Sequence, residues 1–246
     1  MRGGEVPSIR KVVGLLLSPW AWKHLLRTQT AAAVEHLEML RYANPTTVID
    51  VGANKGQFAL VALAAGASRV ISFEPLTSEA AIYRKNFARS PRCTLYEFAL
   101  ADTTGEAILH VADRPDSSSL LPLGAGQKEA FRVGEARTTK VAVKRLDDVI
   151  ESVALGDRVL VKIDVQGAEG AVIRGSKGLL EKVQYVYAEG SFVELYEGQL
   201  VAGELVQLMD NAGFTLRGIY NVTHTKNYGA TQADFLFENQ YSRSRS

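Results

Sequence analysis

Carboxylates follow short hydrophobic segments at several points of the sequence, where they are placed to bind or deprotonate a ligand. In VIDVGANKGQF (residues 48–58), Asp50 precedes a turn that contains Gly52, Asn54 and Gly56. Glycine permits positive φ and lets a ligand approach the backbone closely, and asparagine tolerates the same conformation. The turn lacks the G-x-G-x-x-G spacing of dinucleotide-binding proteins. Asp50 would repel a pyrophosphate, so we expect it to bind an ammonium or sulfonium group, directly or through water.

Two further acids are spaced to hold a nucleoside. Glu74, in FEP, follows Asp50 by 24 residues, close to the ~20-residue offset of an acid that binds ribose hydroxyls. Asp102, which ends ALAD, is expected to contact an adenine amino group beside backbone groups of Ala99 and Leu100. S-adenosylmethionine, a nucleoside with a positively charged amino-acid tail, fits these positions. The alternative is that the two glycines only form a short strand-to-helix connection. The predicted cofactor contacts are Asp50, Gly52, Asn54, Gly56, Phe58, Glu74, Ala99, Leu100, Asp102 and Asp164.

A second group of acids could assist the chemical step. The segment VKIDVQGAE contains Lys162 and Asp164, which are two residues apart and share a strand face. They form either a structural ion pair or a site in which Asp164 is a general base or metal ligand. Glu169 begins the next helix, where it is a capping residue or a ligand. Asp164, Glu169 and Glu189 could together hold a magnesium-like ion, because hard cations prefer oxygen ligands, or could act without metal.

Three other stretches remain open to two interpretations each. His224, in NVTHTKN, is expected in a loop, as a base or as a solvated side chain. The segment DSSSLLP (residues 116–122) is an active-site lid or a surface loop. Glu194 and Tyr196 line an acceptor pocket, or Tyr196 packs against a helix. The candidate catalytic residues are Asp164, Lys162, Glu189 and His224.

The hydrophobic pattern predicts the elements that must position these residues. Short, β-branched segments without alternation are typical of buried parallel strands. The predicted strands are residues 46–52, 69–75, 93–102, 157–167 and 184–191, and the predicted helices are residues 57–67, 78–90, 168–183 and 200–214. We expect a hairpin from residues 106–112 and 137–146, and a closing antiparallel pair from residues 215–222 and 233–239.

Alternating strands and helices predict an α/β fold with a doubly wound parallel sheet, whose ligands bind beyond the carboxyl ends of the strands. We expect an N-terminal helical extension (1–44), a ligand-binding domain (45–240) and a polar tail (241–246). Within the extension, helical spacing is seen over residues 8–43. The apolar run VVGLLL is too short to span a bilayer, so its helix packs on the domain or associates weakly with a membrane surface.

Composition excludes several classes of protein. The chain has 246 residues, a formal net charge of +1 and one cysteine, Cys93. A near-neutral chain is not a general nucleic-acid binder. One cysteine excludes an internal disulfide framework and fits a reducing compartment, so we expect a cytoplasmic protein. The N-terminal helices could form a homodimer contact or roof the acceptor pocket.

Several motifs together resemble the FkbM family of S-adenosylmethionine-dependent methyltransferases. They are VIDVGANKGQFAL, ISFEP, EFALAD, LVKIDVQGAEGAVIRG and AEGSFVELYEGQ, and the resemblance runs from about Thr46 to Phe237. It implies a class I methyltransferase fold, Rossmann-like, with seven strands and an antiparallel last strand. It also implies O-methylation of a sugar, glycan or natural-product hydroxyl, as in glycan or natural-product biosynthesis. The alternatives are a nicotinamide-dependent oxidoreductase, a non-catalytic nucleoside-binding module and, without support from any basic stripe, a nucleic-acid methyltransferase.

Overall fold

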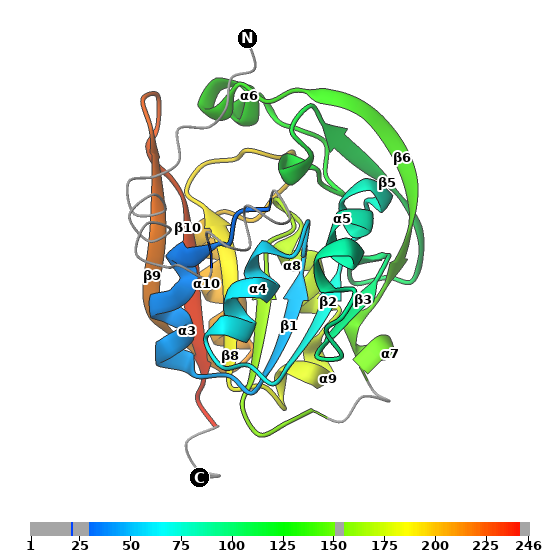
Figure 1. The fold of residues 1–246 in the computed structure, drawn as a ribbon. Helices are drawn as coiled ribbons and strands as arrows, with labels where there is room; N and C mark the ends of the chain where they lie inside the picture. The colour runs from blue at the N-terminus through cyan, green and yellow to red at the C-terminus, as the bar shows by residue number, and fades with distance from the viewer. Residues whose placement is uncertain (1–20, 22–29, 151–154, 242–246) are drawn as a thin grey trace.

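A seven-stranded sheet forms the centre of the computed structural model, which describes residues 21, 30–150 and 155–241 (Figure 1). Its order is β3-β2-β1-β7-β8-β10-β9. Five strands are parallel, and β10 runs antiparallel to both of its neighbours. The predicted doubly wound sheet with its reversed strand is therefore confirmed. The strands are β1 (Thr47–Val51), β2 (Arg69–Phe73), β3 (Cys93–Tyr96), β7 (Val159–Ile163), β8 (Tyr185–Ser191), β9 (Phe214–Thr225) and β10 (Gly229–Asn239).

Helices cover both faces of this sheet, which explains why the central strands are hydrophobic without alternation. Every residue of β1 and β7 is buried, as expected for strands packed on two sides. One apolar core joins the sheet to α3 (Leu37–Ala43), α4 (Gln57–Ala64) and α5 (Thr77–Phe87). The other joins it to α7 (Leu146–Ile150), α8 (Glu169–Arg174), α9 (Lys177–Leu180) and α10 (Ala202–Asn211). Figure 1 shows α3 and α4 on one side of the sheet and α8 to α10 on the other.

A smaller sheet, of order β4-β6-β5, stands beside the main one (Figure 1). It consists of β4 (Ala99–Leu100), β6 (Glu135–Lys144) and β5 (Gly105–Ala112). The predicted hairpin is confirmed, because β5 and β6 pair antiparallel. Their connection contains η2 (Pro115–Ser117) and α6 (Ala125–Phe131). In Figure 1, α6 lies beyond the end of the main sheet toward which the arrow of β1 points.

The prediction of one strand over residues 93–102 is wrong. Cys93–Tyr96 pairs with β2 of the main sheet, whereas Ala99 and Leu100 pair with β6. Between them the Phe98 ring packs on Phe73, with ring centroids 5.6 Å apart. The chain thus passes from one sheet to the other, a tertiary choice that hydrophobicity alone does not reveal.

The predicted helix over residues 168–183 is two helices, α8 and α9. They separate around Gly175, where an added Cβ would lie 2.0 Å from the carbonyl oxygen of Ala101. The backbone of this break therefore packs directly against the segment that follows β4.

The predicted N-terminal extension is described only in part. Residues 30–33 are not helical, η1 (Val34–His36) is a short 3-10 helix, and α3 ends at Asn44 with φ of 42°. Val34, Met39 and Leu40 belong to the core under α4. Apart from the buried Ala21, the rest of the predicted helix, including its apolar run, lies outside the described residues, as does most of the predicted tail. None of the described helices is long and apolar enough to cross a membrane.

Candidate active site

A cavity opens where β1, β2 and β7 end, between the N-terminal segment and the connection from β5 to β6. Its empty space, with the open mouth included, is about 1080 Å³. Its lining includes Glu35, His36, Gly52, Asn54, Gln57, Phe58, Glu74, Phe98, Ala99, Leu100, Ser118, Ser119, Lys162, Asp164 and Gln166. The serines belong to the predicted lid segment, which therefore borders the cavity.

The turn after β1 brings its backbone to the cavity through two residues with positive φ. Gly52 has φ of 78° and Asn54 has φ of 49°. A Cβ on Gly52 would lie 1.8 Å from the carbonyl oxygen of Asp164, so the close approach of two strand ends requires glycine here. The Gly52 N–H and the Ala53 N–H both donate to the carbonyl of Phe73. The turn is thereby fixed against β2.

Glu74 holds this turn from the end of β2. One carboxylate oxygen accepts from the Asn54 N–H and the other from the Leu76 N–H, both at 2.8 Å. Burial raises the pKa of Glu74 to about 7, although these two hydrogen bonds oppose the shift. Each oxygen retains a further lone pair, and the residue lines the cavity. Glu74 can thus accept two hydroxyl hydrogens while its orientation stays fixed by the backbone.

Asp102 does not reach the cavity, contrary to the sequence prediction. It lies in the turn after β4, and its carboxylate accepts from Arg174 Nε at 3.0 Å. The reason is the passage of the chain into the smaller sheet, which turns this end of the predicted strand toward α8. Phe98, Ala99 and Leu100 remain in the lining, so this wall is mainly apolar.

Gly56 is also outside the lining. A Cβ on Gly56 would lie 2.4 Å from Phe87 and 2.9 Å from Tyr83. The glycine is therefore explained by packing against α5 rather than by the approach of a ligand. Phe58, in the first turn of α4, does line the cavity, as predicted.

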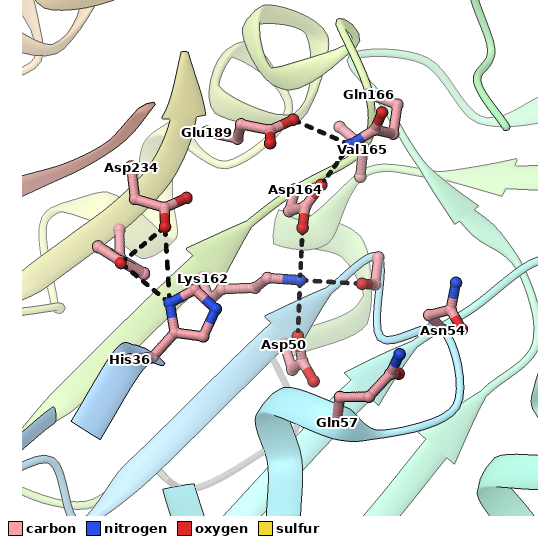
Figure 2. A network of polar contacts seen from close by, with 12 residues as sticks. His36, Asp50, Asn54, Gln57, Lys162, Asp164, Val165, Gln166, Glu189 and Asp234 are labelled. Atoms are coloured by element: carbon pink, nitrogen blue, oxygen red, sulfur yellow. Dashed lines mark hydrogen bonds and ion pairs between the residues drawn. The ribbon is translucent and has the colours of Figure 1, made fainter. Parts of the chain in front are cut away.

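Lys162 is enclosed by the two predicted acids of neighbouring strands (Figure 2). Its Nζ lies 3.3 Å from Asp50 and 3.5 Å from Asp164, and it donates to the carbonyl of Gly52 at 2.9 Å. Burial alone would lower the pKa of Lys162, but Asp50 and Asp164 outweigh it and hold the pKa above its ordinary value. Lys162 thus stays protonated and is unsuited to be the base. Asp50 is fully buried and not part of the lining, so this arrangement offers it no direct contact with a ligand in the cavity. The predicted contact through water stays a prediction.

Gln166 joins the remaining predicted acids. Its Nε2 donates to Asp164 and to Glu189, each at 2.9 Å, and its Oε1 accepts from the Tyr196 hydroxyl at 2.8 Å. Gln232 donates to Glu189 as well, at 3.0 Å. Burial raises the pKa of Glu189 well above its ordinary value. Tyr196 is fully buried rather than exposed to the cavity. Its hydrogen-bond partner Gln166, which the sequence analysis missed, lines the cavity instead.

The three acids predicted as metal ligands do not converge. Glu169 turns to its own loop, where it accepts from the N–H groups of Val165 and Gly167. The Gln166 amide separates Asp164 from Glu189 (Figure 2). Within residues 30–150 and 155–241, no three His, Cys, Asp or Glu side chains are grouped to hold a metal ion. The residues present therefore do not fit the magnesium site, and Glu169 instead braces the turn between β7 and α8.

His224 is not a loop residue at the cavity. It lies in β9, opposite Ala230 of β10, and its side chain is exposed. Strand β9 extends three residues beyond the predicted segment, because β10 continues to pair with it up to the hairpin. The predicted catalytic role of His224 therefore has no geometric basis.

Among the histidines that the structure describes, His36 is the one that lines the cavity. It comes from η1, packs on Phe58 with ring centroids 5.2 Å apart, and lies with Nδ1 3.0 Å from the hydroxyl of Tyr187. Sequence reasoning missed it, because nothing in the spacing links residue 36 to the strands. Its polar partners Tyr187 and Asn221 belong to strands more than 100 residues away in the chain.

Comparison with known proteins identifies the family. The sequence model of the methyltransferase FkbM domain matches residues 50–216. The chain belongs to the FkbM methyltransferase family. The resemblance noted in the motifs is thereby confirmed, and the chain is a methyltransferase of a family that uses S-adenosylmethionine.

One relative supports the same family assignment. The 2-O-methyltransferase NoeI of Sinorhizobium fredii (strain NBRC 101917 / NGR234) is 30% identical over 195 residues, which cover 75% of this chain and 80% of NoeI.

Solved structures show the same fold at low identity. TehB from Haemophilus influenzae superposes with a TM-score of 0.52 and 10% identity over 89% of this chain and 66% of TehB. Magnesium protoporphyrin IX methyltransferase (ChlM) from Synechocystis PCC 6803, solved with bound SAM, has a TM-score of 0.48 and 12% identity over 94% and 96% of the two chains. The family match and the strand order of the main sheet, together with the superposition on TehB, confirm the predicted class I methyltransferase fold.

Proposed function

We propose that this methyltransferase transfers a methyl group from S-adenosylmethionine to a hydroxyl of a sugar, glycan or related natural product. The observation that carries the proposal is Glu74: a buried carboxylate, fixed by two backbone N–H groups, that faces the cavity beside the turn after β1. The relative named as a 2-O-methyltransferase supports a hydroxyl acceptor.

The cofactor would lie along the part of the cavity wall that the ends of β2 and β1 form. Glu74 would accept the two ribose hydroxyls, and Phe98 and Leu100 would hold the adenine ring against an apolar surface. The backbone of Gly52 and Asn54 would pass beneath the sulfonium and the amino-acid tail. The bound cofactor supplies an electrophilic methyl group, and the protein must hold an oxygen in line with it and exclude water.

The acceptor would then lie beyond the end of β7. Asp164 lines the cavity and is 38% exposed, while Lys162 and Gln166 fix its two oxygens. A carboxylate held in this way can accept a hydrogen bond from an acceptor hydroxyl and orient its oxygen. Ser118 and Ser119, from the connection between β5 and β6, also line the cavity and carry hydroxyls suited to a polyhydroxylated molecule.

Binding and transfer can be tested separately. Calorimetry should show that S-adenosylhomocysteine binds and NAD does not, and that Glu74→Ala abolishes binding. Methyl-labelled S-adenosylmethionine should transfer its label to at least one of a panel of methyl glycosides of hexoses, deoxyhexoses and pentoses. Asp164→Asn should retain S-adenosylhomocysteine binding and lower turnover at least tenfold. Binding of NAD instead, or undiminished binding by Glu74→Ala, would contradict the proposed cofactor site.

A further inference from the structure

Tyr196, which follows β8, joins two parts of the molecule through one buried hydroxyl group. The hydroxyl oxygen lies 2.5 Å from Gln127 Nε2, 2.9 Å from the carbonyl oxygen of Ser117 and 2.8 Å from Gln166 Oε1. Ser117 and Gln127 belong to the connection from β5 to β6, which borders the cavity. Gln166 belongs to the turn after β7 and holds Asp164. The hydroxyl therefore lies between the connection and the residue that fixes the predicted catalytic acid.

The chemistry of the neighbouring groups assigns the hydrogens of this cluster. A hydroxyl group has one hydrogen to donate and can accept from further donors. The Ser117 carbonyl and Oε1 of Gln166 are both acceptors, so the hydroxyl hydrogen of Tyr196 serves these two. The amide of Gln127 is then the donor to the hydroxyl oxygen. Because one hydrogen serves two acceptors, the position of Ser117 affects the hydrogen bond that Gln166 receives.

The packing around Tyr196 also involves both parts. The Gly124 N–H, in the connection from β5 to β6, donates to the carbonyl of Leu195 at 2.9 Å. A Cβ on Gly124 would lie 2.9 Å from the same oxygen. In the turn after β7, a Cβ on Gly167 would lie 2.9 Å from the ring of Tyr196. Both segments thus pack closely against Tyr196 and the residue before it, and together they set the place of the hydroxyl.

Gln166 is held in a backbone conformation that side chains rarely adopt. Its φ is 57°, in the left-handed region, where residues other than glycine are uncommon. Such a conformation persists where the surrounding contacts enforce it, and it is frequent at functional sites. Here both amide hydrogens of Gln166 go to carboxylates, those of Asp164 and Glu189 (Figure 2). Gln166 is therefore suited to orient Asp164 rather than to donate to a ligand itself.

We propose that Tyr196 is a positioning residue of the methyl transfer, whose hydroxyl links the lid segment (residues 116–122) to the orientation of Asp164 through Gln166. The inference rests on the proposed O-methyltransferase function, in which Asp164 orients the acceptor hydroxyl. Asp116 and Ser118 both line the cavity, so the Ser117 carbonyl that Tyr196 contacts lies between two lining residues. A lid segment in this place would thus support the alignment of Asp164 beside the acceptor.

Tyr196 is not suited to take part in proton transfer itself. Its side chain is fully buried and outside the cavity lining. Burial, with the charge of Glu189 adding to it, raises the pKa of Tyr196 above its ordinary value. The hydroxyl therefore stays neutral and acts through its hydrogen bonds.

The test is a double-mutant cycle between Tyr196→Phe and Asp164→Asn in the full chain. The probe is the methyl glycoside that the wild-type protein methylates fastest. Tyr196→Phe removes only the hydroxyl and should lower kcat about tenfold, because a misplaced catalytic group loses much of its effect. In the Asp164→Asn background it should lower kcat by less than about twofold, because both substitutions remove the same interaction. A purely structural role would instead multiply the two losses.

Tyr83→Phe is the matched control, because it also removes a buried tyrosine hydroxyl. The Tyr83 hydroxyl contacts Ser72 Oγ at 2.8 Å and lies outside the lining. Tyr83→Phe should change kcat by less than about twofold, as expected of a site without shared partners. Both variants should bind S-adenosylhomocysteine as the wild type does.

Hydrogen exchange measured by mass spectrometry tests the link without any acceptor. In Tyr196→Phe saturated with S-adenosylhomocysteine, peptides within residues 115–131 should exchange faster than in the wild type. The reason is that Ser117 and Gln127 each lose a hydrogen bond, so the connection opens locally more often. Tyr83→Phe should exchange in this region as the wild type does.

Three outcomes would overturn the inference. Tyr196→Phe could match the control variant in kcat. The losses from Tyr196→Phe and Asp164→Asn could multiply, which would show that the two residues act independently. Exchange within residues 115–131 could stay unchanged in Tyr196→Phe, which would show that the hydroxyl does not hold the connection. By contrast, failure of the wild-type protein to bind S-adenosylhomocysteine would contradict the proposed function itself.

Discussion

At the residue scale, single side chains in this site have paired duties. Glu74 both holds the turn after β1 and faces the space assigned to the ribose. Gln166 holds Asp164 and Glu189 with one amide nitrogen. The residue type alone predicted a site position correctly where a single added atom would not fit. Gly52 was predicted from sequence and is required because Asp164 leaves no room for a Cβ.

The raised pKa of Glu74 predicts a pH dependence of cofactor binding. In the proposed complex the ionised carboxylate would accept both ribose hydroxyls, and its pKa is about 7 in the free protein. Below this pH a proton must be lost before binding, so affinity for S-adenosylhomocysteine should fall about tenfold between pH 8 and pH 6. Titration calorimetry at both pH values would measure it.

Glu74→Gln is the matched control for this dependence, because other buried acids titrate in the same range. The variant should bind more weakly at pH 8 and should show little change between pH 8 and pH 6. If the wild-type slope persisted in Glu74→Gln, another group would be its source.

At the element scale, the connections between strands and helices decide what each acid does. Glu169 begins α8, as predicted, yet it bonds to two N–H groups of the preceding turn instead of pointing into the cavity. Asp102 lies at the end of its predicted segment, but that segment divides between two sheets. The sequence placed both residues correctly at the ends of their predicted segments. It could not show the direction in which each strand-to-helix or strand-to-strand connection turns the side chain.

Glu169 predicts a stability change that depends on pH. Burial raises its pKa to about 7 from an ordinary 4.5, so the folded state binds its proton more tightly than the unfolded state. The free energy of unfolding therefore falls as the pH rises from 4.5 to 7. Glu169→Gln avoids this loss and should be more stable than the wild type at pH 8, by up to about 3 kcal/mol.

Urea denaturation at pH 5 and pH 8 would measure this difference. The advantage of Glu169→Gln should be small at pH 5 and should level off above pH 7. Glu181→Gln, at an exposed residue after α9, should have no comparable effect. An advantage of equal size at both pH values would show that burial of the charge is not its cause.

At the scale of the whole molecule, the described part of the N-terminal extension is built into the fold. Met39 and Leu40 are fully buried in the core that joins α3 to α4 and the sheet, and His36 borders the cavity. The predicted boundary at residue 44 follows the end of a helix, but the packing crosses it. The part of the chain outside the matched family domain is therefore expected to affect both stability and activity.

Truncation of Leu40 tests this integration. Leu40→Ala removes a fully buried side chain from a close-packed core and should lower the free energy of unfolding by about 2–5 kcal/mol. Glu38→Ala, on the exposed side of the same helix, should change it by less than about 0.5 kcal/mol. Denaturant unfolding of both variants would measure the difference. Equal effects would mean that α3 packs loosely and acts as an appendage.

The sequence by itself determined the alternation of strands and helices, the glycine turn and the acids at the strand ends, because periodicity, φ preference and charge are local properties. Family membership followed from the same motifs. Only the tertiary structure decided that Asp102 and His224 face away, that Gln166 separates the acids, and that His36 meets Tyr187 and Asp234. These outcomes depend on strand register and chain crossings, which bring residues of separate elements together, in the case of His36 and Tyr187 from more than 100 positions apart. No local pattern encodes such a contact.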